Sequence, residues 1–490
     1  MTRALMFQGT GSDVGKTVLV AGLCRAAKRR GLNVVPFKPQ NMSNNAAVAK
    51  AGNGEGEIGR GQWLQALACG VEPTVHMNPV LLKPQSQIGS QVVLQGKVWG
   101  NAKAREYLSL KPQLLESVMD SFKRVGEGAD LVLVEGAGSP AEINLRAGDI
   151  ANMGFAAEAD VPVVLIGDID RGGVIASIVG THTILPKEDR DMVAGYLINK
   201  FRGDISLFDD GLTSITEFSG WPSFGILPWV EAVKRLPAED SVALDKLNGQ
   251  LPEGFRVVVP AMGKIANFDD LDPLKAEPGV ALQFIRKGDP FPEKVDMIVL
   301  PGSKSTISDM VELWENGWEQ PIKDFAASGG LVIGVCGGYQ ILGKRISDPK
   351  GLEGDIPEIE GLGLLNVETD LLPEKTVQNF EPVSCEFGCE LTGYEIHMGY
   401  TDGPDCSRPM VNFDGRFDGA ISQAGNVRGC YLHGLFNADI YRKALLKEQG
   451  FEADETLSYR ENVETALDEL AEAMEEYLDV DGLLALAREV

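Results

Sequence analysis

The chain has 490 residues, which is longer than one ordinary domain, so we expect two or three domains. Its residues are 44% hydrophobic and 24% charged, a composition that supports a sizeable core and excludes wholesale disorder. The formal net charge of −26 argues against nucleic acid and anionic membranes as partners, because both require a basic surface.

The cysteines and the apolar runs of the sequence indicate the cellular compartment of the protein. No run reaches the roughly 18 apolar residues of a membrane span, and the N-terminus leads directly into a strand without a cleavage site. Seven cysteines, an odd number scattered over the chain, indicate a reducing cytoplasm. The loose pair Cys385 and Cys389, in a chain with only four histidines, is a poor signal for zinc.

The first element is a strand over residues 4–8, followed by the glycine-rich run 9–17 (GTGSDVGKT) and an apolar helix to about Arg30. Glycines allow backbone N–H groups to turn around phosphate oxygens, and the helix N-terminus adds positive charge. We predict an ATP site in which Lys16 reaches the β- and γ-phosphates and Thr17 binds Mg²⁺. The glycines of that loop include Gly11 and Gly15. The alternative is a glycine-rich turn that binds nothing.

A second strand, over residues 33–37, leads into the polar run 38–45 (KPQNMSNN). Ligands bind at the carboxyl ends of strands in α/β sheets, so Lys38 and Asn41 are candidate substrate contacts. A helix is expected over residues 60–70. Another polar loop follows an apolar run at residues 77–85.

A helix over residues 108–124 precedes a strand, residues 130–134, that ends at Glu135. A carboxylate at a strand tip facing the phosphate-binding loop is a natural Mg²⁺ partner, although a lone acid there is also compatible with simple solvation. Two more strands, 162–166 and 194–198, end in polar loops. This repeated strand, polar loop and helix order predicts a parallel sheet with helices on both faces.

Several further side chains on these loops are candidates for binding. Asp149 is a candidate for positioning Mg²⁺ or substrate, and its place in a loop is the main reason. The cations expected to neutralise substrate carboxylates or phosphates are Lys38, Lys83, Arg146, Arg171 and Arg202. Each of these cations, taken alone, is also compatible with a simple surface charge.

A second α/β unit starts at residue 256, after a linker expected over residues 237–254. Its most informative stretch is 330–340 (GLVIGVCGGYQ), a strand that ends at Cys336 with two glycines before a helix. This is the pattern of a nucleophile on a strained strand-to-helix turn, where the helix terminus favours a thiolate. The alternative is a buried cysteine that ends a core strand.

Near the end of this unit, the strand 427–432 delivers His433, roughly a hundred residues after Cys336. This separation is typical of a Cys–His pair, in which the thiolate attacks a carboxamide and the histidine protonates the leaving ammonia. Backbone N–H groups near Gly302 and Gly337 are candidates for the oxyanion hole. His397 is interpreted as structural or glutamine-binding, and the acidic helix containing Leu467 and Met474 as a packing helix.

The segments 335–340 (VCGGYQ) and 431–434 (YLHG) resemble class I glutamine amidotransferases. The segments 38–45, 168–174 (DIDRGGV) and 199–204 (NKFRGD) resemble the cobyric acid synthase family specifically, and the resemblance runs from about residue 3 to residue 440. The phosphate-binding loop, with Thr10 where the standard pattern has glycine, has the form of the dethiobiotin-synthetase-like branch. By that likeness Asn199 is a candidate contact for adenine.

The resemblance implies an α/β protein with a P-loop synthetase domain at residues 1–236 and an amidotransferase domain at 255–445. A helical extension over 446–490 completes this division. The implied reaction uses ATP, Mg²⁺ and glutamine to amidate the b, d, e and g carboxylates of adenosylcobyrinic acid a,c-diamide, a corrinoid. Ordinary members of the amidotransferase class carry a glutamate two residues after the histidine, where this chain has Leu435. The resemblance implies a Cys–His dyad and leaves the group that orients His433 open.

Two alternatives are weighed against this interpretation. One is the sister enzyme that makes the a,c-diamide, from which the motifs at 38–45 and 168–174 point away. The other is a P-loop switch protein with an inactive amidotransferase-like domain, which the presence of both Cys336 and His433 opposes. Whether the chain forms a homodimer is left open by the sequence.

Overall fold

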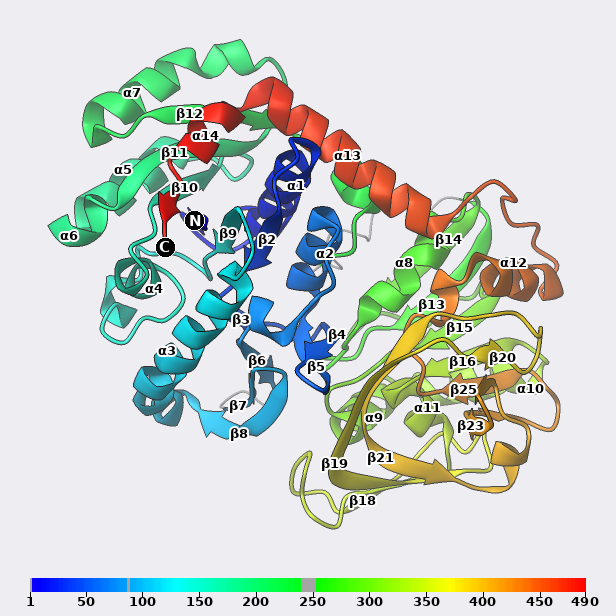
Figure 1. Cartoon of the computed structure of the whole chain (residues 1–490). Helices are drawn as coiled ribbons and strands as arrows, with labels where there is room; N and C mark the ends of the chain where they lie inside the picture. The colour runs from blue at the N-terminus through cyan, green and yellow to red at the C-terminus, as the bar shows by residue number, and fades with distance from the viewer. Residues whose placement is uncertain (1, 86–88, 239–252) are drawn as a thin grey trace. The chain divides into compact units, whose positions relative to one another are not determined.

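The computed structural model describes residues 2–85, 89–238 and 253–490 (Figure 1). The chain forms two compact α/β units. Unit 1 comprises Met1–Ser43, Ala49–Pro237 and Val463–Val490, and unit 2 comprises Asn44–Val48 and Ala238–Asn462. Most of the predicted linker 237–254 lies outside the described residues.

Unit 1 is built on a parallel sheet with the strand order β12-β11-β10-β1-β9-β2. The strands are buried nearly throughout, as expected for a parallel sheet covered on both faces. The five strands predicted for this sheet are confirmed, with ends shifted by at most three residues, and the sixth, β12, was not predicted. The strands are β1 (Arg3–Gly9), β2 (Val34–Phe37), β9 (Leu131–Glu135), β10 (Val163–Asp168), β11 (Val193–Phe201) and β12 (Ser223–Pro228).

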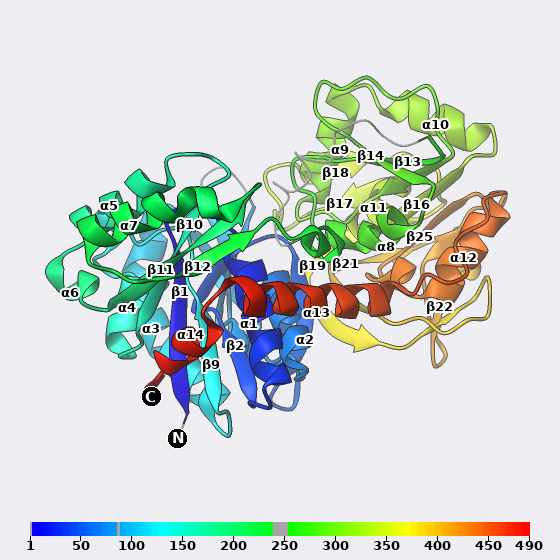
Figure 2. The same cartoon turned by 90° about the horizontal axis from the view of Figure 1, so that it is seen from above.

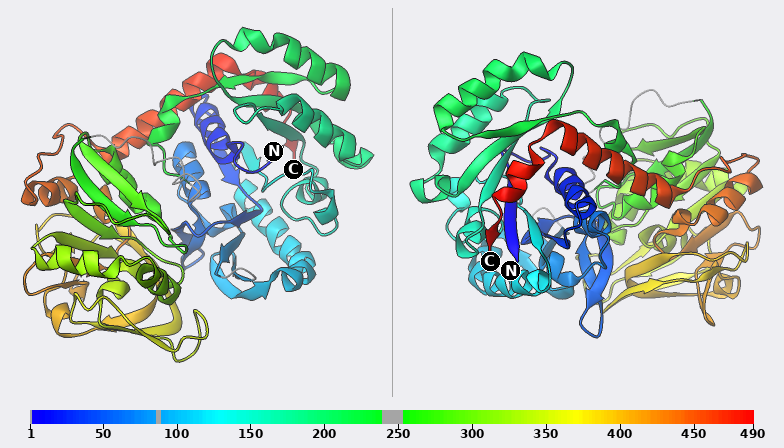
Figure 3. Two further views of the ribbon diagram at one scale, coloured as in Figure 1. Left: turned by 180° about the vertical axis from the view of Figure 1, so that it is seen from behind. Right: turned by 45° about the horizontal axis from the view of Figure 1, so that its top comes forward.

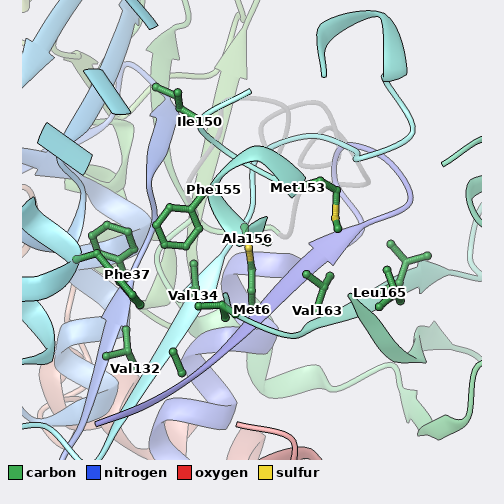
Figure 4. Packing of buried hydrophobic residues seen from close by; sticks show 14 of the residues in the cluster. Met6, Phe37, Val132, Val134, Ile150, Met153, Phe155, Ala156, Val163 and Leu165 are labelled. Atoms are coloured by element: carbon green, nitrogen blue, oxygen red, sulfur yellow. The ribbon is translucent and has the colours of Figure 1, made fainter. Parts of the chain in front are cut away.

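Alternate residues of these strands point to opposite faces, and one face packs against four helices. Met6, Val132 and Val134 meet Phe37 and Phe155 on this face, as Figure 4 shows. The rings of Phe37, Phe122 and Phe155 pack against one another with centroids 5.2 to 5.5 Å apart. The helices of this face are α3 (Ala104–Gly126), α4 (Met153–Glu158), α5 (Val174–Ile184) and α7 (Asp209–Ser219).

The opposite face carries α1 (Lys16–Arg29), and the C-terminal helix α13 (Tyr459–Tyr477) runs beside it (Figures 1 and 2). A Cβ atom at Gly22 would lie 2.5 Å from the Met474 side chain, so the two helices are closely packed. Arg25 pairs with Glu464, and Arg29 pairs with Glu472 at 3.0 Å. The acidic helix is therefore a packing helix of unit 1, as its apolar spacing predicted.

The two ends of the chain lie side by side in both views of Figure 3. The last strand, β26 (Arg488–Glu489), pairs antiparallel with the first residues of β1, and α14 (Val480–Ala485) precedes it. The Val490 N–H also donates to the Thr2 carbonyl at 3.0 Å. The C-terminal segment thus completes the sheet that begins the chain.

A second, smaller sheet in unit 1 follows β2 and was not predicted from the sequence. Its order is β3-β6-β7-β8, and helix α2 (Arg60–Cys69), which was predicted, lies between its strands in the sequence. A hairpin of β4 (Ala46–Ala51) and β5 (Gly54–Gly59) precedes this helix. The strands of the small sheet are β3 (Gln40–Met42), β6 (Val80–Pro84), β7 (Gly89–Leu94) and β8 (Lys97–Lys103).

Unit 2 has its own sheet, ordered β14-β13-β15-β16-β25-β24, parallel except for β24. Strand β16 (Leu331–Val335) lies between β15 (Met297–Leu300) and β25 (Val427–Cys430). Because parallel neighbours end at the same edge, this order brings the ends of β15, β16 and β25 together. The outer strands are β13 (Phe255–Pro260), β14 (Val280–Ile285) and β24 (Ala420–Ile421).

Both faces of this sheet are buried in separate apolar clusters. Val257, Val299 and Ile333 belong to one cluster, and their neighbours Val258 and Ile298 belong to the other. The helices of unit 2 are α8 (Asp272–Ala276), α9 (Thr306–Glu315), α10 (Glu319–Ala327), α11 (Gly337–Leu342) and α12 (Asp439–Glu448). Two smaller sheets are ordered β18-β17-β19-β21 and β20-β22-β23. Their short strands are β17 (Arg345–Ser347), β18 (Glu358–Glu360), β20 (Val383–Ser384), β22 (Val411–Phe413) and β23 (Arg416–Asp418). Their longest strands are β19 (Glu368–Phe380) and β21 (Gly393–Asp402).

No helix in the part of the chain that the structure describes is long and apolar enough to cross a bilayer.

Candidate active site

Cys336 occupies the turn between β16 and α11, with φ 53° and ψ −109°. A non-glycine residue with positive φ is uncommon, and such strain concentrates at functional sites. The turn also requires close backbone approach, because a Cβ atom at Gly338 would lie 2.0 Å from the Leu300 carbonyl oxygen. The Cys336 thiol is buried and lies 3.6 Å from the Ile396 carbonyl, to which it donates. The predicted strained turn is therefore present.

His433 follows β25 and is buried beside an aspartate that the sequence did not single out. Its Nδ1 atom lies 2.7 Å from Asp270 Oδ2, and the other oxygen of Asp270 accepts the Gly434 N–H at 2.7 Å. The His433 N–H also donates to the Tyr394 carbonyl at 2.8 Å. These bonds hold the imidazole so that Nδ1 faces Asp270 and Nε2 is left for another partner.

The electrostatics of His433 favour its charged form. Burial by itself lowers the pKa of His433, but the charges of Asp270 and Cys336, and their hydrogen bonds to the ring, raise it to about 10. The charged form of His433 therefore lies next to both the Asp270 carboxylate and the Cys336 sulfur. Cys336, His433 and Asp270 thus form a linked row of a thiol, an imidazole and a carboxylate.

Gly302 and Gly337, the predicted oxyanion-hole residues, border this row. A Cβ atom at Gly302 would lie 3.1 Å from the His433 Cε1 atom, and one at Gly337 would lie 2.8 Å from the Ser303 backbone nitrogen. Side chains at these positions would therefore push the strand ends apart. Both glycines lie at the same sheet edge as Cys336 and His433. This is where N–H groups that stabilise a developing oxyanion are expected, and the oxyanion-hole role of the two glycines stays a prediction.

In unit 1, the phosphate-binding loop lies between β1 and α1. Gly15 has φ 90°, a left-handed conformation that glycine adopts without strain. The Lys16 ammonium donates to the carbonyls of Gly11 and Gly138 at 3.1 Å each, so it crosses the mouth of the loop. This is the position from which a lysine reaches bound phosphates.

Glu135, at the end of β9, is fully buried in a ring of donors. Its Oε1 accepts the Thr17 hydroxyl at 2.7 Å and the Lys38 ammonium at 2.8 Å. Its Oε2 accepts Gln65 at 2.6 Å and Gln62 at 3.3 Å. A hydroxyl and a carboxylate oxygen side by side at a phosphate-binding loop are hard ligands that suit Mg²⁺. The residues present therefore fit a magnesium–nucleotide site.

Two family models match the chain, one for each unit. The CobQ/CobB/MinD/ParA nucleotide binding domain matches residues 5–243, and the CobB/CobQ-like glutamine amidotransferase domain matches residues 256–440. A cobyric acid synthase of Brucella suis biovar 1 is 63% identical over 99% of this chain and all of its own length. A cobyric acid synthase of Mesorhizobium japonicum is 61% identical over the whole of both chains. The chain belongs to the cobyric acid synthase family.

Membership of the cobyric acid synthase family confirms the resemblance stated from the motifs, and the α/β fold with a P-loop domain and an amidotransferase domain. The family also makes the chain an enzyme, a glutamine amidotransferase that works in cobalamin synthesis. Membership of the family does not assign a role to each side chain, so these roles are inferred from the geometry of the site.

Asp149 is the predicted site residue whose contacts differ most from the expected role. Its carboxylate accepts the N–H groups of Ala151, Asn152 and Gly154 at 2.8 to 3.2 Å, which shapes the loop before α4. A Cβ atom at Gly154 would lie 1.8 Å from the Asp149 carbonyl oxygen, so this loop is tightly closed. These contacts give Asp149 a clear structural role, and its part in Mg²⁺ or substrate binding stays a prediction.

Asn199 and Lys38 both lie at the nucleotide loop but are already engaged. The Asn199 side chain donates to the Val14 carbonyl at 2.8 Å and accepts the Lys200 N–H at 2.9 Å, which braces the phosphate-binding loop. Lys38 forms a buried ion pair with Glu135. An adenine contact of Asn199 and a substrate contact of Lys38 stay predictions, and each would share a side chain that already stabilises the loop.

The predicted cations of the substrate loops have acidic partners in the structure. Arg171 contacts Asp13 at 3.0 Å, on the phosphate-binding loop itself, and remains largely exposed. The other pairs are Lys83 with Glu57, Arg146 with Asp189 and Arg202 with Asp170, at 2.6 to 2.8 Å. A substrate carboxylate would have to displace the acidic partner of each cation. Exposed ion pairs are weak, so this displacement costs least at Arg171 and Arg202.

Sequence reasoning missed Asp270, Gln62 and Gln65. Asp270 belongs to a short 3-10 helix, η6 (Phe268–Leu271), that follows β13 at the same sheet edge as Cys336. The acidic pair Asp269-Asp270 after a predicted strand was the available signal. The two glutamines lie on α2 and face Glu135, and their helical spacing of three residues was the only hint of a shared face.

Proposed function

We propose that the chain amidates the b, d, e and g carboxylates of adenosylcobyrinic acid a,c-diamide to give adenosylcobyric acid, with ATP as the activating and glutamine as the nitrogen-donating substrate. The observation that carries the catalytic part is the buried row of Cys336, His433 and Asp270 at one edge of the unit 2 sheet. The 61–63% identity to cobyric acid synthases supports the substrate.

In the glutaminase reaction, the Cys336 thiolate attacks the carboxamide carbon of glutamine. His433 is the acid that protonates the departing ammonia, and then the base that activates water to release glutamate. Asp270 fixes the Nδ1–H tautomer, so that Nε2 faces the sulfur. The N–H groups of Gly302 and Gly337 stabilise the negative charge that develops on the carbonyl oxygen.

In the synthetase reaction, a corrinoid carboxylate takes the γ-phosphoryl group of ATP and becomes a good acyl donor, after which ammonia displaces phosphate. Lys16 and the loop N–H groups position the phosphates. Thr17 and Glu135 would hold Mg²⁺, which supplies charge neutralisation when bound. Lys38 and Gln65 fix the Glu135 carboxylate in place for that purpose.

The proposal includes the cellular compartment and the partners of the enzyme. All seven cysteines of the chain are free, which supports a reducing cytoplasm. The net charge of −26 supports small-molecule partners over nucleic acid and membranes. A homodimer would be recognised by sedimentation equilibrium of the purified chain.

The test is to incubate the full chain with MgATP, glutamine and the a,c-diamide and to weigh the corrinoid. Each amidation replaces OH by NH₂ and lowers the mass by about one unit, so the product should be lighter by about four. An unchanged mass while ATP is consumed would defeat the substrate assignment. Amidation of cobyrinic acid itself, with the a,c-diamide left untouched, would favour the sister diamide synthase. Nucleotide binding without glutaminase activity would favour a switch protein.

A further inference from the structure

Five residues of the polar run that follows β2 belong to unit 2. The chain leaves unit 1 after Ser43, contributes Asn44–Val48 to unit 2, and returns to unit 1 at Ala49. These five residues are called the docking segment below. Four of them, Asn45 to Val48, are at most 2% exposed, so the segment is firmly packed.

The docking segment is held by a reciprocal pair of hydrogen bonds to Asn267. The Asn267 N–H donates to Asn45 Oδ1 at 2.7 Å, and the Ala46 N–H donates to Asn267 Oδ1 at 3.0 Å. Both asparagines are buried, at 2% and 3% exposure. Hydrogen bonds between buried polar groups are costly to break, because each group would be left unsatisfied.

Asn267 has φ 52°, one of the few left-handed non-glycine residues in the described chain. Such strain persists only where surrounding contacts enforce it, and it concentrates at functional sites. Asparagine tolerates this conformation better than most residues. The paired bonds to Asn45 and Ala46 are contacts that enforce it.

The residues on either side of Asn267 touch the glutaminase machinery directly. On one side, the Ala266 N–H donates to the Gly302 carbonyl at 2.8 Å, which fixes one wall of the oxyanion hole. On the other side, Asn267 begins the helix η6, its carbonyl accepts the Asp270 N–H at 3.1 Å, and Asp270 holds His433. One buried residue thus links Gly302 to Asp270.

The same polar run also reaches the nucleotide site in unit 1. Lys38 pairs with Glu135 at 2.8 Å, and Asn41 donates to Gln62, which in turn contacts Glu135. Only three residues lie between Asn41 and Asn45 in the chain. A short stretch of backbone therefore connects Lys38 and Asn41 to the docking segment.

We propose that Asn45 and Asn267 are positioning residues for glutamine hydrolysis, and that the docking segment ties the glutaminase site to the state of the nucleotide and substrate site. This inference rests on the proposed function, since it concerns the same glutaminase reaction. When the docking segment is bound to Asn267, Asn267 keeps Asp270 and Gly302 in their positions relative to Cys336. Without the paired bonds, the chemistry slows although no residue that touches glutamine has changed.

The decisive variants are Asn267→Gly and Asn267→Asp. Glycine keeps the left-handed backbone but removes the side-chain acceptor for Ala46, whereas aspartate keeps that acceptor. A matched pair is Asn45→Ala and Asn44→Ala, because Asn44 is the neighbouring side chain and its Oδ1 accepts no hydrogen bond. All four are made in the full chain.

Each variant is assayed for glutamate release, for amidation with glutamine, and for amidation with ammonium chloride in place of glutamine. We expect Asn267→Gly and Asn45→Ala to lower the glutaminase kcat by about 100-fold, as a small misplacement of catalytic groups does, with KM for glutamine little changed. The proposal also predicts that MgATP and the a,c-diamide stimulate glutaminase in the unmodified chain, and that this stimulation falls in the same two variants. Asn44→Ala and ammonia-dependent amidation should match the unmodified chain, and Asn267→Asp, which keeps the acceptor but adds a buried charge, should retain more glutaminase activity than Asn267→Gly.

Equal effects of Asn267→Gly and Asn267→Asp, or of Asn45→Ala and Asn44→Ala, would overturn the proposal. Loss of ammonia-dependent amidation together with glutaminase would also overturn it, since that result shows general damage to the fold. Failure of the proposed function is a different result, in which the unmodified chain releases no glutamate from glutamine.

Discussion

The Oδ2 atom of Asp270 lies 2.7 Å from Nδ1 of His433, across 163 residues of sequence. Ordinary triad amidotransferases carry a glutamate two residues after the histidine, where this chain has Leu435, a buried apolar residue. In this chain the imidazole instead contacts a carboxylate from η6, which follows β13. The expected Cys–His dyad is geometrically a row of three residues.

Replacing Asp270 by asparagine should separate the two half-reactions. The amide has no charge to stabilise the imidazolium and favours the wrong tautomer, so glutaminase kcat should fall by about 10³- to 10⁴-fold. Ammonia-dependent amidation should persist, because it bypasses Cys336. Asp414→Asn, which removes the same charge from an exposed turn, is the matched control and should leave both rates unchanged. A normal glutaminase rate in Asp270→Asn would show that Asp270 does not orient His433.

The stability of the chain should depend on pH through the same pair. The pKa of His433 is raised from 6.5 to about 10 in the folded state, so its contribution is fully present below pH 6.5 and is lost as pH rises through about 10. The free energy of unfolding of the unmodified chain should therefore exceed that of Asp270→Asn most at pH 6, and the difference should shrink toward pH 10. Urea denaturation across this range measures it. A difference independent of pH would contradict the ion pair.

The loop that carries Gly302 predicts a second pH effect of a different kind. Burial raises the pKa of Asp309 to about 7, even though Ser303 Oγ donates to its carboxylate at 2.6 Å. The unfolded carboxyl ionises near 3.8, so the charged form costs stability progressively from about pH 4 and fully above pH 7. Asp309→Asn should then be more stable, relative to the unmodified chain, at pH 8 than at pH 4. Thermal denaturation at both values tests the sign, and the reverse order would refute it.

The parallel strands and the nucleophile turn were predictable because local physics determines them. Apolar runs such as Met297–Leu300 must be buried strands, and the glycines after Cys336 permit only a tight turn. Asp270 was not predictable, since its partner lies 163 residues away and nothing local distinguishes it from Asp269. The small sheet β3-β6-β7-β8 was not predicted for a related reason. Its first strand, Gln40–Met42, is polar, and it pairs with β6, which is distant in the sequence.

The sequence also did not show that the side chains predicted to bind substrate already form ion pairs within the protein. Lys38 and Arg171 were read as free cations, yet each has an acid beside it whose position depends on the tertiary fold. Composition reveals that an acidic chain needs local basic groups for an anionic substrate, but it does not reveal which of them are already paired.

Glu135 supplies the last prediction, because its carboxylate serves both the nucleotide site and the core of unit 1. Glu135→Gln should abolish MgATP binding, since the amide is a poor ligand for Mg²⁺ beside Thr17. It should also destabilise unit 1 by about 3–5 kcal/mol, because the Lys38 ammonium is left buried without its counter-charge. Titration calorimetry with MgATP and urea denaturation measure the two effects.

The double variant Lys38→Met, Glu135→Gln provides the control for that second effect. Removing both charges leaves no unpaired ion, so much of the lost stability should return while MgATP binding stays absent. Basal glutamate release, measured without nucleotide, should survive in both variants, because Cys336, His433 and Asp270 all belong to unit 2. A stimulation of glutamate release by MgATP should be lost in both. If Glu135→Gln bound MgATP normally, the carboxylate would be a structural partner of Lys38 alone, and the assignment of Thr17 and Glu135 as the magnesium ligands would be lost.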